Sequence, residues 1–180
     1  MSTIWEHIPS IALIENRELA DKVRRCWDTA IERSVFNETE VAEIPFTMLI
    51  PNCPLSLLAH TESVTSCAYA VATDIMAKNP LIRFDLDILV AGGILHDVGK
   101  LLEYDRVDGK IVKSEFGKYL RHPISGAALA LEAGLPPHVA HIIAAHSKEG
   151  DPFPRSLEGN LINHADFINF ESYKIVLGVK

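Results

Sequence analysis

The sequence is poor in the residues that build disulfide frameworks and thiolate metal sites. Its 180 residues include three cysteines, Cys26, Cys53 and Cys67, and no two of them form a CxxC pair. An odd number of widely spaced cysteines is not typical of a secreted disulfide scaffold, nor of a structural zinc site, whose cysteine ligands come in close pairs. The cysteine usage therefore favours a reducing compartment, and we expect a cytoplasmic protein.

Long apolar runs and an excess of basic residues are also missing. The apolar runs are much shorter than the about 20 residues of a membrane span, and residues 1–15 lack the basic-then-apolar order of a signal peptide. We therefore expect no membrane association. Acidic residues outnumber lysine and arginine by 24 to 17, a formal net charge of −7. Because proteins that grip nucleic acid by its phosphates usually present a basic surface, the charge argues against broad nucleic-acid binding.

Hydrophobic residues in helical patterns are abundant. They make up 48% of the chain, which is enough for a sizeable core. Helical spacing of apolar positions, with capping residues and helix breakers at the ends, predicts six helices. They cover about residues 16–36, 55–78, 85–96, 123–133, 137–146 and 156–173. The sequence therefore predicts an all-α fold, organised as a helical bundle.

Two segments interrupt the helical pattern. Residues 37–54 contain three prolines and are predicted to form an irregular connection. Residues 104–113 are polar and contain the pair Asp108-Gly109, which predicts a small β-hairpin.

The irregular connection divides the predicted chain into two parts. Residues 1–54 form an N-terminal helical arm that ends in the connection, and residues 55–180 form the main domain. The arm carries Trp5, Trp27 and the apolar stripe of the first helix. We expect these side chains to pack onto the main domain, and packing onto a second copy in a homodimer is the alternative.

Eight histidines are present, and several fall at the ends of predicted helices. A buried neutral histidine needs a partner for each ring nitrogen. Several buried histidines whose helix ends converge need a shared partner, and a metal ion is the economical one. Imidazole nitrogen and carboxylate oxygen are good ligands for zinc, iron and manganese.

The strongest local signal is the segment from Leu95 to Lys100, which reads LHDVGK. Neighbouring residues on a helix point about 100° apart, so His96 and Asp97 meet one ion only if it lies over the edge between them. The glycines in and before this segment let another backbone or a substrate approach closely. Lys100 lies one turn beyond His96, where its charge would stand beside a substrate phosphate.

Residues outside this segment extend the pattern. The whole set is His60, His96, Asp97, His122, His146 and Asp166. It resembles the H…HD…D pattern of the HD-domain superfamily of metal-dependent phosphohydrolases, together with the two further histidines of its HDIG-like branch with paired metals. The successive spacings of 36, 25, 24 and 20 residues fit this pattern, counting the HD pair as one step. The resemblance covers about residues 55–170.

The resemblance implies a helical HD fold that binds a divalent transition metal, as two ions of iron, manganese or zinc. One ion would be held by His60, His96, Asp97 and Asp166, and the second by His122 and His146, with Asp97 bridging the two. The implied activity is hydrolysis of a phosphate ester, of a nucleotide or another small phosphorylated metabolite, by metal-activated hydroxide. Asp97 and Lys100 are the catalytic candidates, and Lys100 and Arg121 are the candidates for binding the substrate.

Two alternatives to this function stay open. A di-iron oxygenase of the same superfamily, which cleaves a C–P or C–C bond with O2, would use the same ligands. A non-catalytic, metal-containing ligand-sensing domain would keep the ligands without the reaction. Specificity is expected from the segments around the site, residues 43–53, 104–119 and 150–155. His164 is expected in the core or in support of a ligand.

Overall fold

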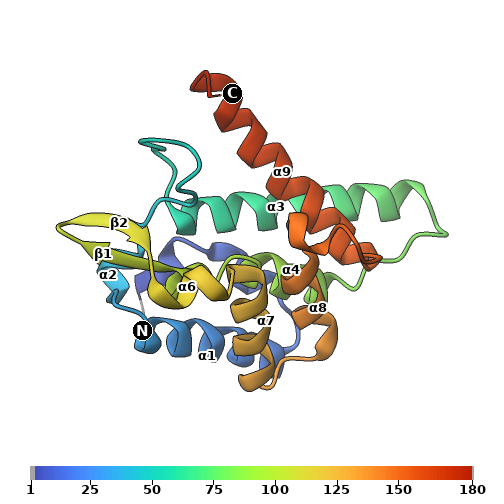
Figure 1. The fold of residues 1–180 in the computed structure, drawn as a ribbon. Coiled ribbons are helices and arrows are strands. Elements are labelled where there is room, and N and C mark those ends of the chain that lie inside the picture. Colours follow the sequence, from blue (N-terminus) through green and yellow to red (C-terminus); the bar gives the residue numbers. More distant parts are fainter. Residues whose placement is uncertain (1–2, 180) are drawn as a thin grey trace.

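The computed structural model describes residues 3–179. Within that range, six long helices form the body of the molecule (Figure 1). They are α1 (Arg17–Arg33), α3 (Leu57–Lys78), α4 (Leu86–Leu95), α7 (His122–Glu132), α8 (Pro137–Ala145) and α9 (Leu157–Val176). Every long helix expected from the sequence is present, and the prediction of an all-α fold is confirmed.

Shorter elements connect the long helices. They are the 3-10 turns η1 (Thr3–Glu6), η2 (Pro9–Leu13) and η3 (Lys148–Gly150), the short helices α2 (Glu38–Val41), α5 (Lys100–Glu103) and α6 (Glu115–Tyr119), and the strands β1 (Tyr104–Val107) and β2 (Lys110–Lys113). The two strands pair antiparallel, with Tyr104 opposite Lys113. Asp108 and Gly109 turn the chain at positive φ values of 50° and 75°. The predicted hairpin is therefore confirmed.

The prediction that residues 37–54 are irregular throughout was wrong at α2. Asn37 accepts a hydrogen bond from the backbone N–H of Glu40, and the Glu40 side chain accepts one from the N–H of Asn37. This reciprocal pair satisfies two backbone donors at the start of the helix. The prolines that follow α2 confine it to a single turn.

Side-chain caps decide where several long helices begin. Asn16, Ser56, Asp85 and Ser156 each accept a hydrogen bond from the backbone N–H three residues ahead. Such a cap satisfies one of the N–H groups that have no partner within the helix. The caps fix the register of α1, α3, α4 and α9, and hence the direction of each side chain that these helices carry.

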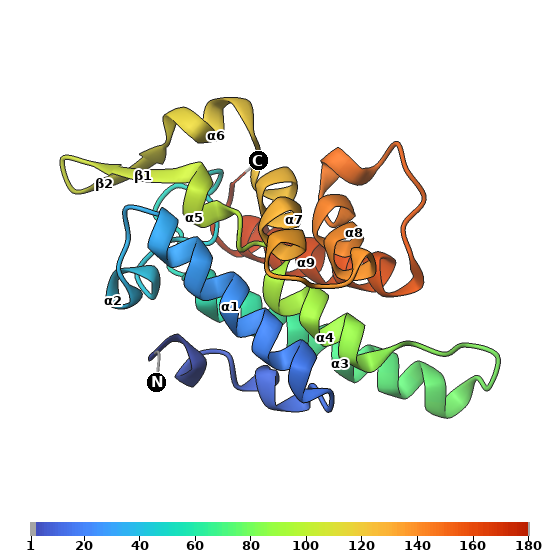
Figure 2. The same ribbon diagram turned by 90° about the horizontal axis from the view of Figure 1, so that it is seen from below.

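Helix α4 lies at the centre of the molecule. Residues 89–95 are all buried, and the helix packs against α1, α3, α8 and α9 (Figure 2). A helix segment that is surrounded on all sides must be apolar all round, which explains why no polar residue occurs from Ile88 to Leu95. Since α4 is held from every side, the residues that follow its last turn have a well-defined position.

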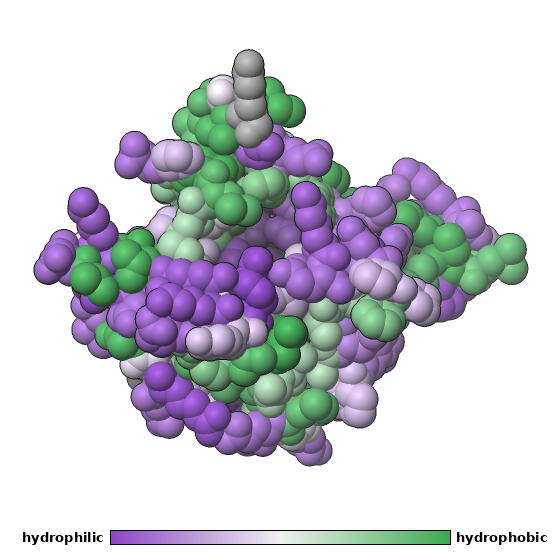
Figure 3. Space-filling model, in the orientation of Figure 1, coloured by the Kyte–Doolittle hydropathy of each residue, from purple (hydrophilic) through white to green (hydrophobic). Residues whose placement is uncertain are grey.

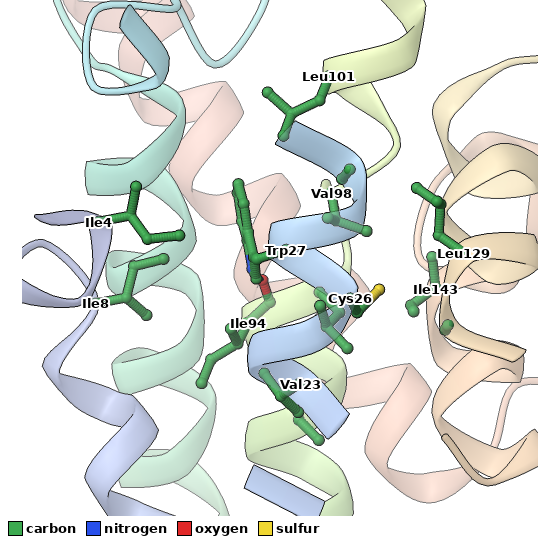
Figure 4. Packing of buried hydrophobic residues seen from close by; sticks show 14 of the residues in the cluster. Ile4, Ile8, Val23, Cys26, Trp27, Ile94, Val98, Leu101, Leu129 and Ile143 are labelled. Carbon is green, nitrogen blue, oxygen red and sulfur yellow. The ribbon is translucent and has the colours of Figure 1, made fainter. Parts of the chain in front are cut away.

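The N-terminal segment contributes to the same core as α4. The side chains of Ile4, Ile8 and Trp27 pack in one cluster with Ile94 and Val98 (Figure 4). The indole N–H of Trp27 donates a hydrogen bond of 3.2 Å to the carbonyl oxygen of Ile94. The arm thus packs directly against the helix that leads to the HD pair. The boundary at residue 54 and the homodimer stay predictions.

We predict that Trp27→Ala lowers the free energy of unfolding by about 3–5 kcal/mol, because it leaves a large cavity in the core. It also leaves the Ile94 carbonyl without its donor. The matched control is Trp5→Ala, which removes a half-buried indole and should cost about 1 kcal/mol. Urea unfolding followed by circular dichroism gives both values. Equal losses in the two variants would contradict the central role of Trp27.

Candidate metal centre

The structure brings the six predicted ligands to one region. His60 lies in the first turn of α3, His96 and Asp97 follow the last turn of α4, His122 opens α7, His146 follows the last turn of α8, and Asp166 lies within α9. Helix ends from four separate parts of the chain therefore converge. Five of the six residues are buried, with Asp166 the exception.

The HD pair occupies the turn between two helices. Helix α4 ends at Leu95, and residues 96–99 form the turn that leads into α5. The Nε2 atom of His96 lies 3.4 Å from Oδ2 of Asp97, so the two neighbours face one point. A Cβ atom at Gly99 would lie 2.2 Å from the backbone oxygen of His122. The expected close approach of another backbone is thus found here, where it brings the start of α7 beside the pair.

Each oxygen of the Asp97 carboxylate faces a different pair of histidines. Oδ2 lies 3.5 Å from Nε2 of His60 and 3.4 Å from Nε2 of His96. Oδ1 lies 3.3 Å from Nε2 of His122 and 3.6 Å from Nε2 of His146. The result is two groups of three residues that share Asp97. Within each group, every candidate ligand atom is within 4.8 Å of the others.

Hydrogen bonds on the far side of three imidazoles fix their tautomers. Nδ1 of His96 and Nδ1 of His146 each lie 2.7 Å from a backbone carbonyl oxygen, and Nδ1 of His122 lies 2.6 Å from Oε2 of Glu103. A carbonyl oxygen or an ionised carboxylate only accepts, so each Nδ1 carries the hydrogen. In the neutral ring this leaves the lone pair on Nε2, the atom that faces Asp97.

The resulting donor set fits a cation. Nε2 of His60 and Nε2 of His96 lie 3.2 Å apart, close to the carboxylate of Asp97. Two ring nitrogens at this distance repel one another unless a proton or a metal ion lies between them. Imidazole nitrogen with carboxylate oxygen is a ligand set for zinc, iron or manganese. The buried residues therefore fit a divalent metal.

Charge preferences in the centre agree with this fit. Burial lowers the pKa of His60 and lowers the pKa of His122 to about 4, which keeps both rings neutral. Burial acts in the same direction on His96, but the neighbouring carboxylate of Asp97 outweighs it and raises the pKa of that ring. The centre thus favours a positive charge between the carboxylates and the imidazoles.

Asp166 stands at the open side of the centre. Its Oδ1 lies 3.1 Å from Nε2 of His60, and its side chain is 18% exposed. Burial raises its pKa, but the contact with His60 outweighs burial and holds the pKa at about 2. The molecular surface is hollowed beneath the projecting end of α9, and hydrophilic residues border the hollow (Figure 3).

The two cations proposed for substrate binding are held by protein acceptors. Nζ of Lys100 is buried, 2.5 Å from Oδ2 of Asp97 and 2.5 Å from the carbonyl oxygen of Phe46. Arg121 is 45% exposed and pairs with Glu103 at 2.7 Å and with Glu149 at 3.3 Å. Contact of either residue with a substrate stays a prediction.

Sequence reasoning missed Glu103. It is buried, and Oε2 accepts hydrogen bonds from the backbone N–H of His122 at 2.9 Å and from its Nδ1 at 2.6 Å. Although burial raises the pKa of Glu103, the bonds with His122 outweigh burial and lower it to about 2. The signal was its position one turn after Lys100, on the same side of a short helix.

Two further supporting residues were missed, and one expectation was wrong. The ring of Phe46 stacks on His60, and the Asn163 amide donates a hydrogen bond of 2.6 Å to the backbone oxygen of His146. His164, expected in the core or in support of a ligand, is exposed. The turn of α9 directs Asn163 inward in its place, one residue earlier than expected.

Comparisons with known proteins agree with the assignment of these residues to a metal centre. The HD domain family matches residues 57–168, more than half of the chain. The chain belongs to this family, a superfamily of metal-dependent phosphohydrolases. No solved structure matches it. In the part of the chain that the structure describes, no helix combines the length and apolarity needed to cross a membrane.

Three curated proteins illustrate the similarity. Ribonuclease Y of Desulforudis audaxviator is 33% identical over 114 residues, which are 63% of this chain and 18% of that protein. Dihydroneopterin 2',3'-cyclic phosphate phosphodiesterase of Methanocaldococcus jannaschii is 29% identical over 111 residues, 61% of this chain and 44% of that protein. An uncharacterized protein of the same organism is 27% identical over 137 residues, 68% of this chain and 72% of that protein. The matched region thus spans less than half of the first two relatives.

We predict that Glu103→Gln weakens metal binding about 10- to 100-fold, the usual effect of removing a residue that orients a ligand. Glutamine keeps the size of the side chain but removes the charge that holds His122. Calorimetric titration of the metal-free protein with Mn²⁺ measures the change. The control is Glu115→Gln, whose side chain is 82% exposed and pairs with Lys118 outside the centre. Unchanged affinity in Glu103→Gln would remove Glu103 from the support of His122.

Proposed function

We propose that this protein hydrolyses a small phosphate ester, a nucleotide or a related phosphorylated metabolite, with the help of two divalent metal ions. The observation that carries the proposal is the Asp97 carboxylate, which faces two histidines with each of its oxygens. The names of two relatives, a cyclic phosphate phosphodiesterase and a ribonuclease, support a phosphodiester as the first substrate to test.

The two groups of residues would each hold one ion. The first consists of His60, His96, Asp97 and Asp166, and the second of Asp97, His122 and His146. When bound, divalent ions lower the pKa of water towards about 7 and neutralise charge on a phosphoryl group. Asp97 is the residue that belongs to both groups, so its loss would disable both.

The remaining residues position groups of the centre and neutralise charge. Lys100 balances the buried charge of Asp97, and the protein carbonyl at Phe46 holds the ammonium group in place. Arg121 stands at the rim, where its exposed guanidinium can meet an anion that approaches from solvent. The hollow beneath α9 is the side from which we propose that the substrate reaches the centre (Figure 3).

We predict that Asp97→Asn loses both metal and activity. Protein purified without oxygen is analysed for its elements and then assayed with bis(p-nitrophenyl) phosphate and with nucleoside 2',3'-cyclic phosphates. The wild type should contain about two ions per chain. In Asp97→Asn the rate should fall by more than the about 100-fold that is typical of changes outside the ligand set.

The matched control is Asp74→Asn on α3, an exposed residue that pairs with Lys78. It should keep both metal and activity. An active Asp97→Asn variant would refute the proposal. Two irons per chain with uptake of O2, and no hydrolysis of any ester, would establish the oxygenase alternative instead.

We predict a different result for Lys100→Met. All six candidate ligands remain, so the metal should stay bound. Because we expect the ammonium group also to stabilise charge that develops on the phosphoryl group, turnover should fall about 10²- to 10³-fold, the usual effect of losing one such group. Steady-state kinetics with the same esters, together with metal analysis, give the two readings. Lys118→Met is the control, since this lysine is 54% exposed and pairs only with Glu115 among the described residues. Wild-type turnover in Lys100→Met would remove it from the mechanism.

A further inference from the structure

Phe46 stands at the base of a loop whose two ends are fastened together. The loop runs from the end of α2 to the start of α3. The N–H of Phe46 donates to the carbonyl of Leu55 at 3.1 Å, and the N–H of Leu57 donates to the carbonyl of Ile44 at 2.7 Å. The tip of the loop faces solvent, with Leu49 73% exposed, whereas Phe46 is 1% exposed. The position of Phe46 is therefore fixed relative to the first turn of α3, which carries His60.

The ring of Phe46 packs on the imidazole of His60. The two rings are stacked, with centroids 4.3 Å apart and an angle of 26° between their planes. Phe46 also contacts two aromatic residues of α9, Phe170 at 6.3 Å and Tyr173 at 6.0 Å between ring centroids. Phe170 lies one turn beyond Asp166 on the same helix. Phe46 thus packs both against the ligand His60 and against the helix that carries Asp166, a ligand of the same group.

His60 differs from the other three histidines in how its ring is held. Each of the others directs Nδ1 to an acceptor, which fixes the plane of the ring. Nδ1 of His60 is buried and has no hydrogen-bond partner within the described residues. The His60 imidazole is therefore oriented by the contacts of Nε2 with Asp166 and His96 and, on the face of the ring, by the stacked ring of Phe46.

The backbone of Phe46 acts on the opposite part of the same group. Its carbonyl oxygen accepts a hydrogen bond of 2.5 Å from Nζ of Lys100, and the same Nζ lies 2.5 Å from Oδ2 of Asp97. Oδ2 is the oxygen that faces His60 and His96. A substitution of the side chain leaves the carbonyl in place, so it tests the ring alone.

We infer that Phe46 is a positioning residue for the ion held by the His60 group, and that its ring takes the part which a hydrogen-bond acceptor plays for the other histidines. The inference rests on the proposed two-ion centre. It predicts that the loop before α3 affects the affinity for one of the two ions and not for the other. Among the described residues, the Phe46 ring stacks on or packs against the rings of His60, Phe170 and Tyr173, and not those of His122 or His146. A charged neighbour is Lys100, whose Nζ lies 5.7 Å from the ring centroid.

The test compares Phe46→Leu with the wild type by titration of the metal-free proteins with Co²⁺, followed by absorption spectroscopy and calorimetry. Leucine fills apolar space but offers no ring to stack. The wild type should bind two ions. Phe46→Leu should bind one ion with wild-type affinity and the other about 10- to 100-fold more weakly. In a His146→Ala background, which leaves the His60 group complete, Phe46→Leu should weaken the ion that remains.

A second variant and a control separate this effect from a loss of packing. Phe170→Leu removes half-buried support from the Phe46 ring and should weaken the same ion several-fold, even if Phe46→Leu does not fold. Phe84→Leu removes a half-buried phenylalanine elsewhere in the core and should leave the affinity for both ions unchanged. Melting temperatures of the metal-free proteins report the packing loss of each variant.

The outcomes distinguish this inference from the proposed function. If the wild type binds two ions and both Phe46→Leu and Phe170→Leu bind them unchanged, the inference is wrong and the two-ion centre stands. Equal weakening of both ions also overturns it, because a general loss of packing explains that result. A wild type that binds no ion overturns the proposed function and this inference together.

Discussion

The centre depends on one buried carboxylate. Asp97 is 1% exposed, and its transfer from water into the protein costs free energy that interactions with its neighbours must offset. Burial raises its pKa, but the ammonium group of Lys100 and the surrounding imidazoles outweigh burial and hold the pKa well below its usual range. Its charge therefore persists, and this charge is what makes four converging imidazoles into a site for cations. The convergence of helix ends can be understood as the means of bringing these partners to Asp97.

The sequence predicted the long helices and the residues at the centre because both leave local signals. Apolar spacing marks α1, α3 and α9, and a capping residue such as Asp85 marks where a helix begins. Phe46 and Asn163 left no comparable signal, and that of Glu103 was only its spacing from Lys100. Their roles arise from contacts between segments distant along the chain, and Phe46 lies in a proline-containing stretch with no period to read. His164 shows the same limit, since a one-residue error in the phase of α9 exchanges inside for outside.

The contrast among the four histidines has a structural origin. Three of them lie at helix ends, where backbone carbonyls or the buried Glu103 are available to fix the ring. His60 lies in the first turn of α3, where its ring faces side chains of other segments, among them Phe46 and Asp166. With no acceptor at Nδ1, its ring is positioned by the stacked Phe46 ring together with the contacts of Nε2, and packing is less directional than a hydrogen bond. Among the described residues, His60 thus lacks a hydrogen bond at Nδ1, whereas His96 in the same ligand group has one.

The ligands come from segments that begin at residue 60 and end at residue 166, with long stretches of chain between them. An ion bound in such a place acts as a cross-link. It closes several large loops at one point, and the unfolded chain has no preformed site to match it. Binding then adds to the free energy of unfolding, and once the ion is in excess of its dissociation constant the added stability grows with the logarithm of the ion concentration. The fold of this protein would then respond to the metal supply of its surroundings, becoming more resistant to unfolding as the metal becomes more abundant.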